Sequence, residues 1–212
     1  MLSNPTPRVR KHPDARRAEI LAAAASIALA DGLEGITLRA VAARLGVRPG
    51  LISHYYPAAE DLVVAAFARA VSDEREDLFP DEGDPFTRVA CLISRNEGER
   101  WRELSQLWLN ARHLCRFSPA LAEAVQVQEE VTHRRLVLLI EDGVAAGNFT
   151  VADPGVASSR ILAAIDGVGT YVNNSAPHGD EGIAHFVSDV AEWTLGIPAG
   201  ELCAAVTREQ GG

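Results

Sequence analysis

The stretch ITLRAVAARLGVRPGLISHYYPAAEDL, residues 36–62, holds two short helical patterns separated by a glycine. In the first pattern, apolar residues recur at the three- and four-residue spacing of an amphipathic helix, at Leu38, Val41, Ala42 and Leu45. Thr37 precedes this pattern, where its hydroxyl can cap free backbone N–H groups, and Gly46 follows it as a helix-ending residue. A second helix is expected to begin near Arg48-Pro49, because proline suits the first turn of a helix. The spacing therefore predicts a helix-turn-helix.

The second of these helices has a polar outer face. Val47 and Ile52 are predicted to face inward, which leaves hydrogen-bond donors and one apolar tip outside. Such a set suits phosphates and base edges in the major groove of DNA. The residues on this outer face are Arg48, Gly50, Leu51, Ser53, His54 and Tyr55. The pattern makes double-stranded DNA the first candidate partner.

Residues 16–62 resemble the N-terminal domain of the TetR family of bacterial transcription regulators. The matching landmarks are Ile20 and Ala24 in the first helix, Gly32 at its end, the cap Thr37, the turn Gly46-Val47, and Gly50, Tyr55, Tyr56, Glu60 and Leu62. The segments ISHYY at 52–56 and AIDG at 164–167 look most like the subgroup around the choline-responsive repressor BetI.

The resemblance implies an all-α fold in which a three-helix DNA-binding head precedes a larger helical-bundle body, with about nine helices in total. It also implies a homodimer that represses transcription at a palindromic operator and is released by a small-molecule effector. The complete set of candidate DNA-binding residues is Lys11, Arg16, Arg17, Thr37, Arg39, Arg48, Pro49, Gly50, Leu51, Ser53, His54, Tyr55 and Tyr56. In this reading Tyr56 points outward and donates to a phosphate.

Two positions depart from the family pattern. Arg48 stands where the family often has serine, and Ala59 stands where it often has a lysine that meets a phosphate. One backbone contact is therefore expected to be missing, and Arg48 either replaces it or reads a base.

The charge is unevenly divided along the chain. The net charge of the 212 residues is −9, yet residues 1–56 carry eight Lys/Arg against four Asp/Glu, and residues 57–212 carry twelve against 25. A basic head on an acidic body directs the head toward the DNA polyanion, because neutralised phosphates supply most of the sequence-independent affinity. Acidic surfaces are also ordinary in proteins, but that explanation leaves the sign of the head unexplained.

Other classes of protein find less support in the sequence. No segment approaches the roughly 18 apolar residues that span a bilayer, and no signal-peptide pattern is present, so a cytoplasmic location is expected. Cys91, Cys115 and Cys203 lack CxxC spacing, so no metal site or disulfide is expected and the three are predicted to be small core residues. The sequence has no GxSxG, HExxH or nucleotide-binding glycine loop; no catalytic residue and no cofactor is predicted. A helical protein that binds a ligand or a partner without a DNA role is the main alternative, and an enzyme without a recognisable motif is the weaker one.

Beyond residue 58, proline and capping residues mark successive helices. Asp84-Pro85, Ser118-Pro119 and Asp153-Pro154 each pair a cap with a proline in the first turn. The expected helices span 58–79, 85–95, 99–115, 119–146, 154–174 and 181–195. The domain division that follows is a flexible basic arm at 1–13, a helix-turn-helix domain at 14–57, and an effector-binding and dimerisation domain at 58–212.

Two surfaces of the body are candidate sites. Trp101, Leu104 and Trp108 share one face of a helix that continues to Arg112, and aromatic faces of this kind line either a pocket or the core. Asp166 interrupts an apolar run and needs a partner, which a helix end, a charged side chain or a cationic ligand could supply. The candidate ligand-binding residues are Trp101, Leu104, Trp108, Arg112, Phe117, Gln126, His133 and Asp166. Phe117 closes a pocket mouth or staples onto the next helix.

The last two predicted helices carry small and apolar residues that could meet a second copy of the chain. The resemblance implies a four-helix dimer interface there, whereas packing within one monomer is the plainer explanation. The candidate interface residues are Ala163, Gly167, Ile183, Phe186, Val190 and Trp193.

Overall fold

The computed structural model describes residues 12–96, 99–173, 183 and 185–210. This part of the chain is all-helical, with ten α-helices and one short 3-10 helix. In order, these are α1 (Pro13–Asp31), η1 (Leu33–Gly35), α2 (Leu38–Leu45), α3 (Pro49–Tyr55), α4 (Ala59–Leu78), α5 (Pro85–Arg95), α6 (Glu99–Leu114), α7 (Pro119–Ala145), α8 (Pro154–Val172), α9 (Phe186–Leu195) and α10 (Glu201–Gln210). None of these helices is long and apolar enough to cross a membrane.

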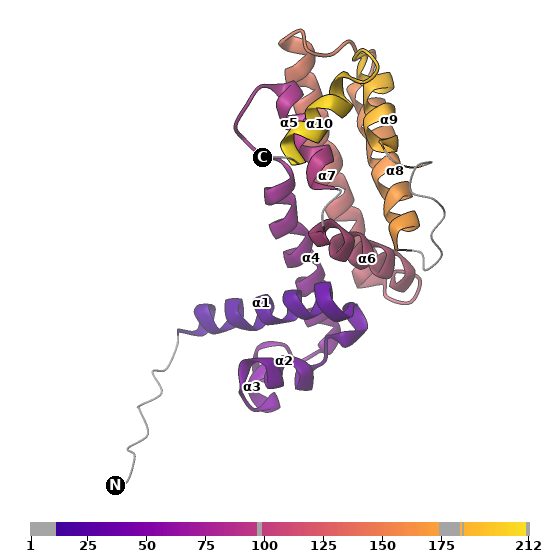
Figure 1. Ribbon diagram of the computed structural model, residues 1–212. Coiled ribbons are helices and arrows are strands. Elements are labelled where there is room, and N and C mark those ends of the chain that lie inside the picture. The colour runs from indigo at the N-terminus through magenta and orange to yellow at the C-terminus, as the bar shows by residue number, and fades with distance from the viewer. Residues whose placement is uncertain (1–11, 97–98, 174–182, 184, 211–212) are drawn as a thin grey trace.

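The head is built by α1, α2 and α3, and α4 connects it to the body (Figure 1). The long axis of α1 crosses the direction of the body helices, and α1 packs against α4. The predicted local signals are confirmed here. The Thr37 hydroxyl accepts from Ala40 N at 3.0 Å, and Gly46 ends α2 in the left-handed conformation at φ 62°. A side chain at Gly46 would strain this turn, because L residues avoid positive φ.

Two hydrophobic cores hold the molecule together. The first joins α1, α2, α3 and α4 to α6 and the start of α7, through residues such as Leu107 and Leu121. The second joins α5, α7, α8, α9 and α10. The first core therefore continues across the division at residues 57 and 58 that the sequence suggested, and helices of the body contribute to the packing of the head.

The helix count from sequence was too low by one, because α10 was missed. Its N-terminus lacks a local capping side chain; instead the buried carboxylate of Glu192, on α9, accepts from Gly200 N, Leu202 N and Cys203 N at 2.7, 2.7 and 3.0 Å. Because this cap comes from a different helix, the residues next to α10 give no sequence signal of a helix start. The helix predicted at 181–195 begins later than expected, at Phe186, because Ile183 and His185 lie in a turn and His185 has a left-handed φ of 65°. The predicted end of α8 at 174 lies outside the described residues.

The three cysteines are free thiols and are half-buried; Cys115 packs against the first core, as predicted, whereas none of the three is fully buried. Burial, together with the charge of Glu129, raises the pKa of the Cys115 thiol. No group of histidine, cysteine or acidic side chains among the described residues could hold a metal ion.

Candidate nucleic-acid interface and body cavity

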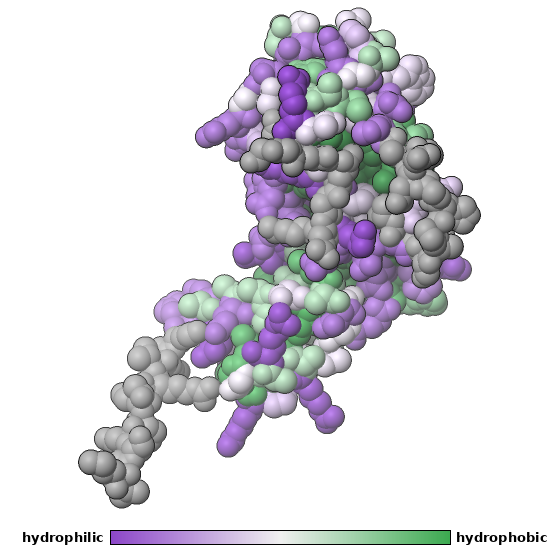
Figure 2. Space-filling view, viewed as in Figure 1, coloured by the Kyte–Doolittle hydropathy of each residue, from purple (hydrophilic) through white to green (hydrophobic). Residues whose placement is uncertain are grey.

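The outer face of α3 is open to solvent. Ile52 is fully buried beneath it, as predicted, whereas Arg48, Gly50 and His54 are exposed. Hydrophilic side chains project from the end of the molecule that α2 and α3 form (Figure 2). A methyl group at Gly50 would meet no protein atom within 4 Å. This face can therefore approach a large partner closely, as entry into a DNA groove requires.

The remaining polar residues of this face are held in defined positions. Arg48 occupies the cap position before α3, and Pro49 opens the helix. The Ser53 hydroxyl donates to Gly50 O at 3.3 Å, and the rings of His54 and Tyr55 meet edge to face. Thr37 and Arg39 are exposed at the start of α2, and Leu51 is partly exposed.

The prediction that Tyr56 points outward was wrong. Its side chain is only 3% exposed and belongs to the core of the head. The guanidinium of Arg17 lies over its ring at 4.7 Å, a cation–π geometry. Tyr56 lies just beyond the last turn of α3, where the chain turns back toward α1, so the same residue that ends the helix also fills the core. Its role is to support Arg17, which stays exposed.

The other basic residues of the head differ in their freedom. Arg16 is partly buried and pairs with Glu19 at 2.6 Å. Arg44, which the sequence reading did not single out, donates to Ser26 Oγ at 2.7 Å and so ties α2 to α1. Lys11 lies outside the described residues.

The body contains a cavity of about 1230 Å³ that is lined by residues of α4, α5, α6, α7 and α8. Seven of the eight predicted ligand-binding residues line it: Trp101, Leu104, Trp108, Arg112, Gln126, His133 and Asp166. Phe117 does not line it. That side chain is 73% exposed and contacts the His113 ring, because it lies in the turn between α6 and α7.

The tryptophans are at once core and cavity wall. Trp101 is 7% exposed, and Trp108 meets the fully buried ring of Phe67 edge to face at 5.3 Å. Both also line the cavity. The two alternatives that the aromatic stripe left open are therefore compatible, since both side chains are packed among other residues and also line the cavity.

Asp166 has a partner from its own chain. Arg112 Nη2 donates to Asp166 at 2.8 Å and Arg112 Nε to Glu129 at 3.1 Å. The same guanidinium lies over the Trp108 ring at 5.3 Å. Burial alone would lower the pKa of Arg112, but its hydrogen bonds to the two carboxylates, with their charges, outweigh this and raise it. Arg112 is thus a fully engaged cation.

The sequence analysis missed three polar residues that either join the head to the body or line the cavity. Asn110, on α6, accepts from Leu33 N at 2.8 Å and donates to Glu34 at 2.7 Å, so it joins the body to the head. Ser118 donates to Glu60 at 2.5 Å and joins the start of α7 to the start of α4. Arg75 lines the cavity from α4 and is only 7% exposed. Their partners are 50 or more residues distant, so no local pattern could have shown them.

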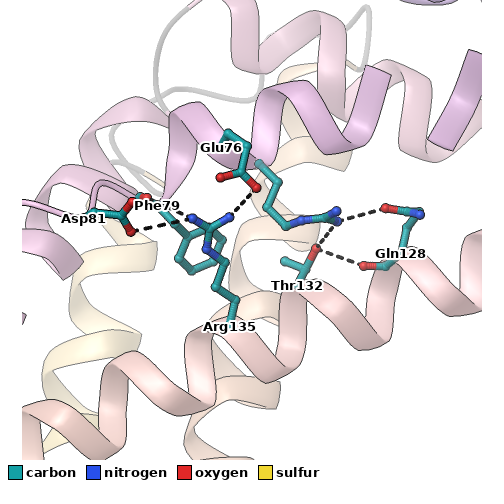
Figure 3. A network of polar contacts seen from close by, with 7 residues as sticks. Glu76, Phe79, Asp81, Gln128, Thr132 and Arg135 are labelled. Atoms are coloured by element: carbon teal, nitrogen blue, oxygen red, sulfur yellow. Dashed lines mark hydrogen bonds and ion pairs between the residues drawn. The ribbon is translucent and has the colours of Figure 1, made fainter. Parts of the chain in front are cut away.

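A second arginine lies near Arg75 but has different partners. Arg135 Nη1 pairs with Glu76 at 2.7 Å and its Nη2 lies 3.9 Å from Asp81, with the Phe79 ring below (Figure 3). The hydrogen bond from Arg135 and its charge lower the pKa of Glu76. This cluster ties the end of α4 to the middle of α7.

The small residues of α8 divide between two faces. Ala164 is buried, and a methyl group at Gly169 would lie 3.1 Å from Ser105 Oγ, so Gly169 allows α6 to approach within the same chain. Ala163 is exposed, and a methyl group at Gly167 would meet nothing within 4 Å. Phe186 and Trp193 on α9 are 44% and 70% exposed. Ile183 and Val190 are partly exposed.

Comparison with known proteins places the head in a family. The model of the tetR family of bacterial regulatory proteins matches residues 20–66, which run from α1 into α4. No curated protein sequence matches the chain.

Solved structures share the whole fold. A TetR transcription regulator from Haloarcula marismortui is 22% identical with a TM-score of 0.68, over 86% of this chain and 99% of that one. A transcriptional regulator from Saccharomonospora viridis in complex with choline is 19% identical with a TM-score of 0.66, over 85% and 95% of the two chains. GusR from Salmonella enterica is 19% identical with a TM-score of 0.65, over 90% and 98%. The matched head and the shared fold lead to one conclusion: residues 20–66 resemble the DNA-binding domain of the tetR family of bacterial regulatory proteins, and the chain as a whole has the fold of these solved regulators.

Proposed function

We propose that the protein is a ligand-responsive repressor that acts in the cytoplasm, binds a palindromic operator as a homodimer, and is released by a small molecule in the body cavity. The observation that carries this proposal is the position of α6. One face of α6 lines the cavity through Trp101, Trp108 and Arg112, while Asn110 on the same helix accepts from the backbone of the head. A ligand that shifts α6 would therefore also shift the head.

The coupling is thermodynamic. A ligand weakens DNA binding only as far as it binds one conformation of the body more tightly than the other. Two heads that read successive major grooves must stand roughly 34–36 Å apart, or a multiple of that distance. A small rotation of each head about α4 would break this register.

The proposed dimer uses the outward faces of α8 and α9. Phe186 and Trp193 are exposed there, beside the open backbone at Gly167. The Arg160 guanidinium, on α8, lies over the Trp193 ring at 4.8 Å. An exposed indole with a neighbouring apolar ring is typical of an interface rather than of free surface. We expect Trp193→Glu to yield monomers in analytical ultracentrifugation with the helical circular dichroism unchanged.

The decisive test of the DNA role is a binding titration against the duplex upstream of the protein's own coding sequence. Affinity should fall steeply with salt, because each phosphate neutralised by the exposed arginines of the head releases a counterion, with a log–log slope of about −0.9 per phosphate. A slope near zero, or equal affinity for every duplex at physiological salt, would contradict the proposal.

The choline in the Saccharomonospora viridis structure suggests a cation as one candidate effector. In this chain, the residues suited to a cation would be the Trp108 ring and the Asp166 carboxylate. Arg112 already lies on both. A cationic ligand would have to displace this internal cation, which argues against that class.

A further inference from the structure

Arg75, in the wall of the cavity, forms no ion pair with any residue that the structure describes. Arg75 Nη1 donates to Gln128 Oε1 at 2.9 Å and to Thr132 Oγ1 at 3.5 Å, both neutral groups on α7. No carboxylate oxygen among the described residues lies within 4.0 Å of its guanidinium. A guanidinium has five N–H donors in a planar fork, and these contacts engage one nitrogen only.

The other arginines of the wall are already neutralised. Arg112 pairs with Asp166 and Glu129, Arg135 with Glu76, and Arg134 with Glu130 at 3.6 Å. The acidic Glu123 of the wall is exposed, so water can solvate it. Within the described wall, Arg75 is thus the buried arginine without an ion pair; Glu76 is close enough to act on its pKa but is paired with Arg135.

The buried positive charge of Arg75 favours the binding of an anion. Burial lowers the pKa of Arg75, against the opposing charge of Glu76, but an arginine remains protonated in proteins. The protein alone therefore carries the cost of a desolvated charge. An incoming anion relieves a cost that already exists, so it need not supply the full desolvation of a new ion pair.

The rest of the wall suits an apolar body. Around Arg75 lie Val71, Leu78 and Leu92, and farther along the cavity lie Trp101, Leu104 and Trp108. Drug-sized ligands occupy sites of roughly 300–1,000 Å³, and the volume of about 1230 Å³ is sufficient for one.

From these observations we infer that the effector is an amphipathic carboxylate, with its carboxyl group on Arg75 and its apolar body against Trp101, Leu104 and Trp108. The planar fork of a guanidinium matches a carboxylate in a two-point contact. A phosphate dianion would need a second free cation, which the described wall does not offer. This inference rests on the proposed effector role of the cavity and names the chemistry of its ligand.

Two matched ligand series test the charge preference in the full-length protein. Decanoate, decanamide and decylamine form one series, and 2-naphthoate, 2-naphthamide and 2-naphthylmethylamine the other; each is titrated by calorimetry. We expect the acid to bind roughly 10- to 100-fold more tightly than its amide, as is typical of charged hydrogen bonds, and the amine to bind most weakly.

Variants then assign this preference to one residue. Arg75→Gln should make acid and amide bind alike, whereas Arg75→Lys should keep part of the preference because it keeps the charge. Arg134→Gln is the matched control, since Arg134 also lines the cavity but its side chain is 74% exposed and paired with Glu130. It should leave the preference unchanged. Circular dichroism melts establish that each variant is folded.

Three results would overturn the inference: binding of neither acid, an amide or amine that binds as tightly as its acid, or an acid preference that survives in folded Arg75→Gln. If Arg75→Gln fails to fold, the comparison within each series and the Arg75→Lys variant still decide. The operator titration is a separate measurement, so the two proposals can fail independently. Acid binding that depends on Arg75 but leaves the operator complex intact would support the site and contradict its effector role.

Discussion

Replacing Gly50 by alanine should separate DNA binding from folding. Gly50 is the second residue of α3, it is exposed, and a methyl group there would meet no protein atom within 4 Å. The backbone needs no special conformation there, since Gly50 does not have a positive φ. We therefore expect Gly50→Ala to fold normally and to bind DNA less tightly.

Gly50→Ala should increase the stability of the fold and decrease the affinity for DNA. Alanine in place of glycine within a helix stabilises by roughly 0.5–1 kcal/mol, and Gly50 lies in the first turn, so the lower end applies. For a chain of this length that corresponds to a rise of about 1–2 °C in the melting temperature. A methyl group forced against a DNA backbone should cost about 1–3 kcal/mol, by analogy with overpacked cores. This is roughly a 5- to 150-fold increase in Kd.

The assay pairs a thermal melt with fluorescence anisotropy on the upstream duplex. Gly155→Ala is a matched control, because Gly155 also follows a helix-opening proline, Pro154, but lies in the body. A methyl group at Gly155 would lie 3.2 Å from Asp153 Oδ1, a tight contact with the oxygen that caps α8, so some loss of stability is expected there. Its DNA affinity should equal that of the natural protein.

An unchanged Kd for Gly50→Ala would mean that the start of α3 does not approach DNA closely, and the reasoning about this face would fail. A large fall in melting temperature would instead mean that the open space at Gly50 is filled in solution. Equal losses of DNA affinity in Gly50→Ala and Gly155→Ala would point to a general defect and not to the interface.

Three further substitutions test the head, its link to the body, and the last helix. If Arg48 reads a base, Arg48→Ala should weaken DNA binding by about 1–3 kcal/mol, and single-base operator variants should show that the loss depends on one base pair. Equal losses on all variants would make Arg48 a contact to the DNA backbone that substitutes for the lysine absent at Ala59. Asn110→Ala leaves Leu33 N without its acceptor, so it should destabilise the fold by about 1–3 kcal/mol, or by less if water enters, and should weaken DNA binding. An unchanged melting temperature and an unchanged Kd would refute a role for Asn110 in positioning the head. Glu192→Ala removes the carboxylate that accepts three backbone N–H groups of α10 and should cost at least 1.5–3 kcal/mol, about the value of one charge-assisted hydrogen bond, with amide exchange in α10 accelerated first. Glu192→Gln is the milder comparison, and equal exchange in all three proteins would exclude the cap.

The helix-turn-helix and most helix boundaries could be read from the sequence because their determinants are local. The cap of Thr37, the left-handed turn at Gly46 and the capped starts at Asp84, Ser118 and Asp153 each involve atoms within four residues. Interactions over so short a range can be inferred from the identities and spacing of neighbouring residues. The aromatic face of α6 was visible for the same reason, since its spacing follows the helical repeat.

The tertiary structure alone decided which polar side chains are buried, exposed or joined. Tyr56 follows the polar face of α3 in sequence but packs into the core under Arg17, and Glu192 caps a helix that its own segment does not contain. Arg75 is one arginine of an ordinary charged helix until α7 packs over it and leaves Gln128 and Thr132 as its partners. Burial depends on the packing of segments that are far apart in the chain. The local pattern therefore fixed the DNA-binding motif, and long-range packing fixed the chemistry of the cavity.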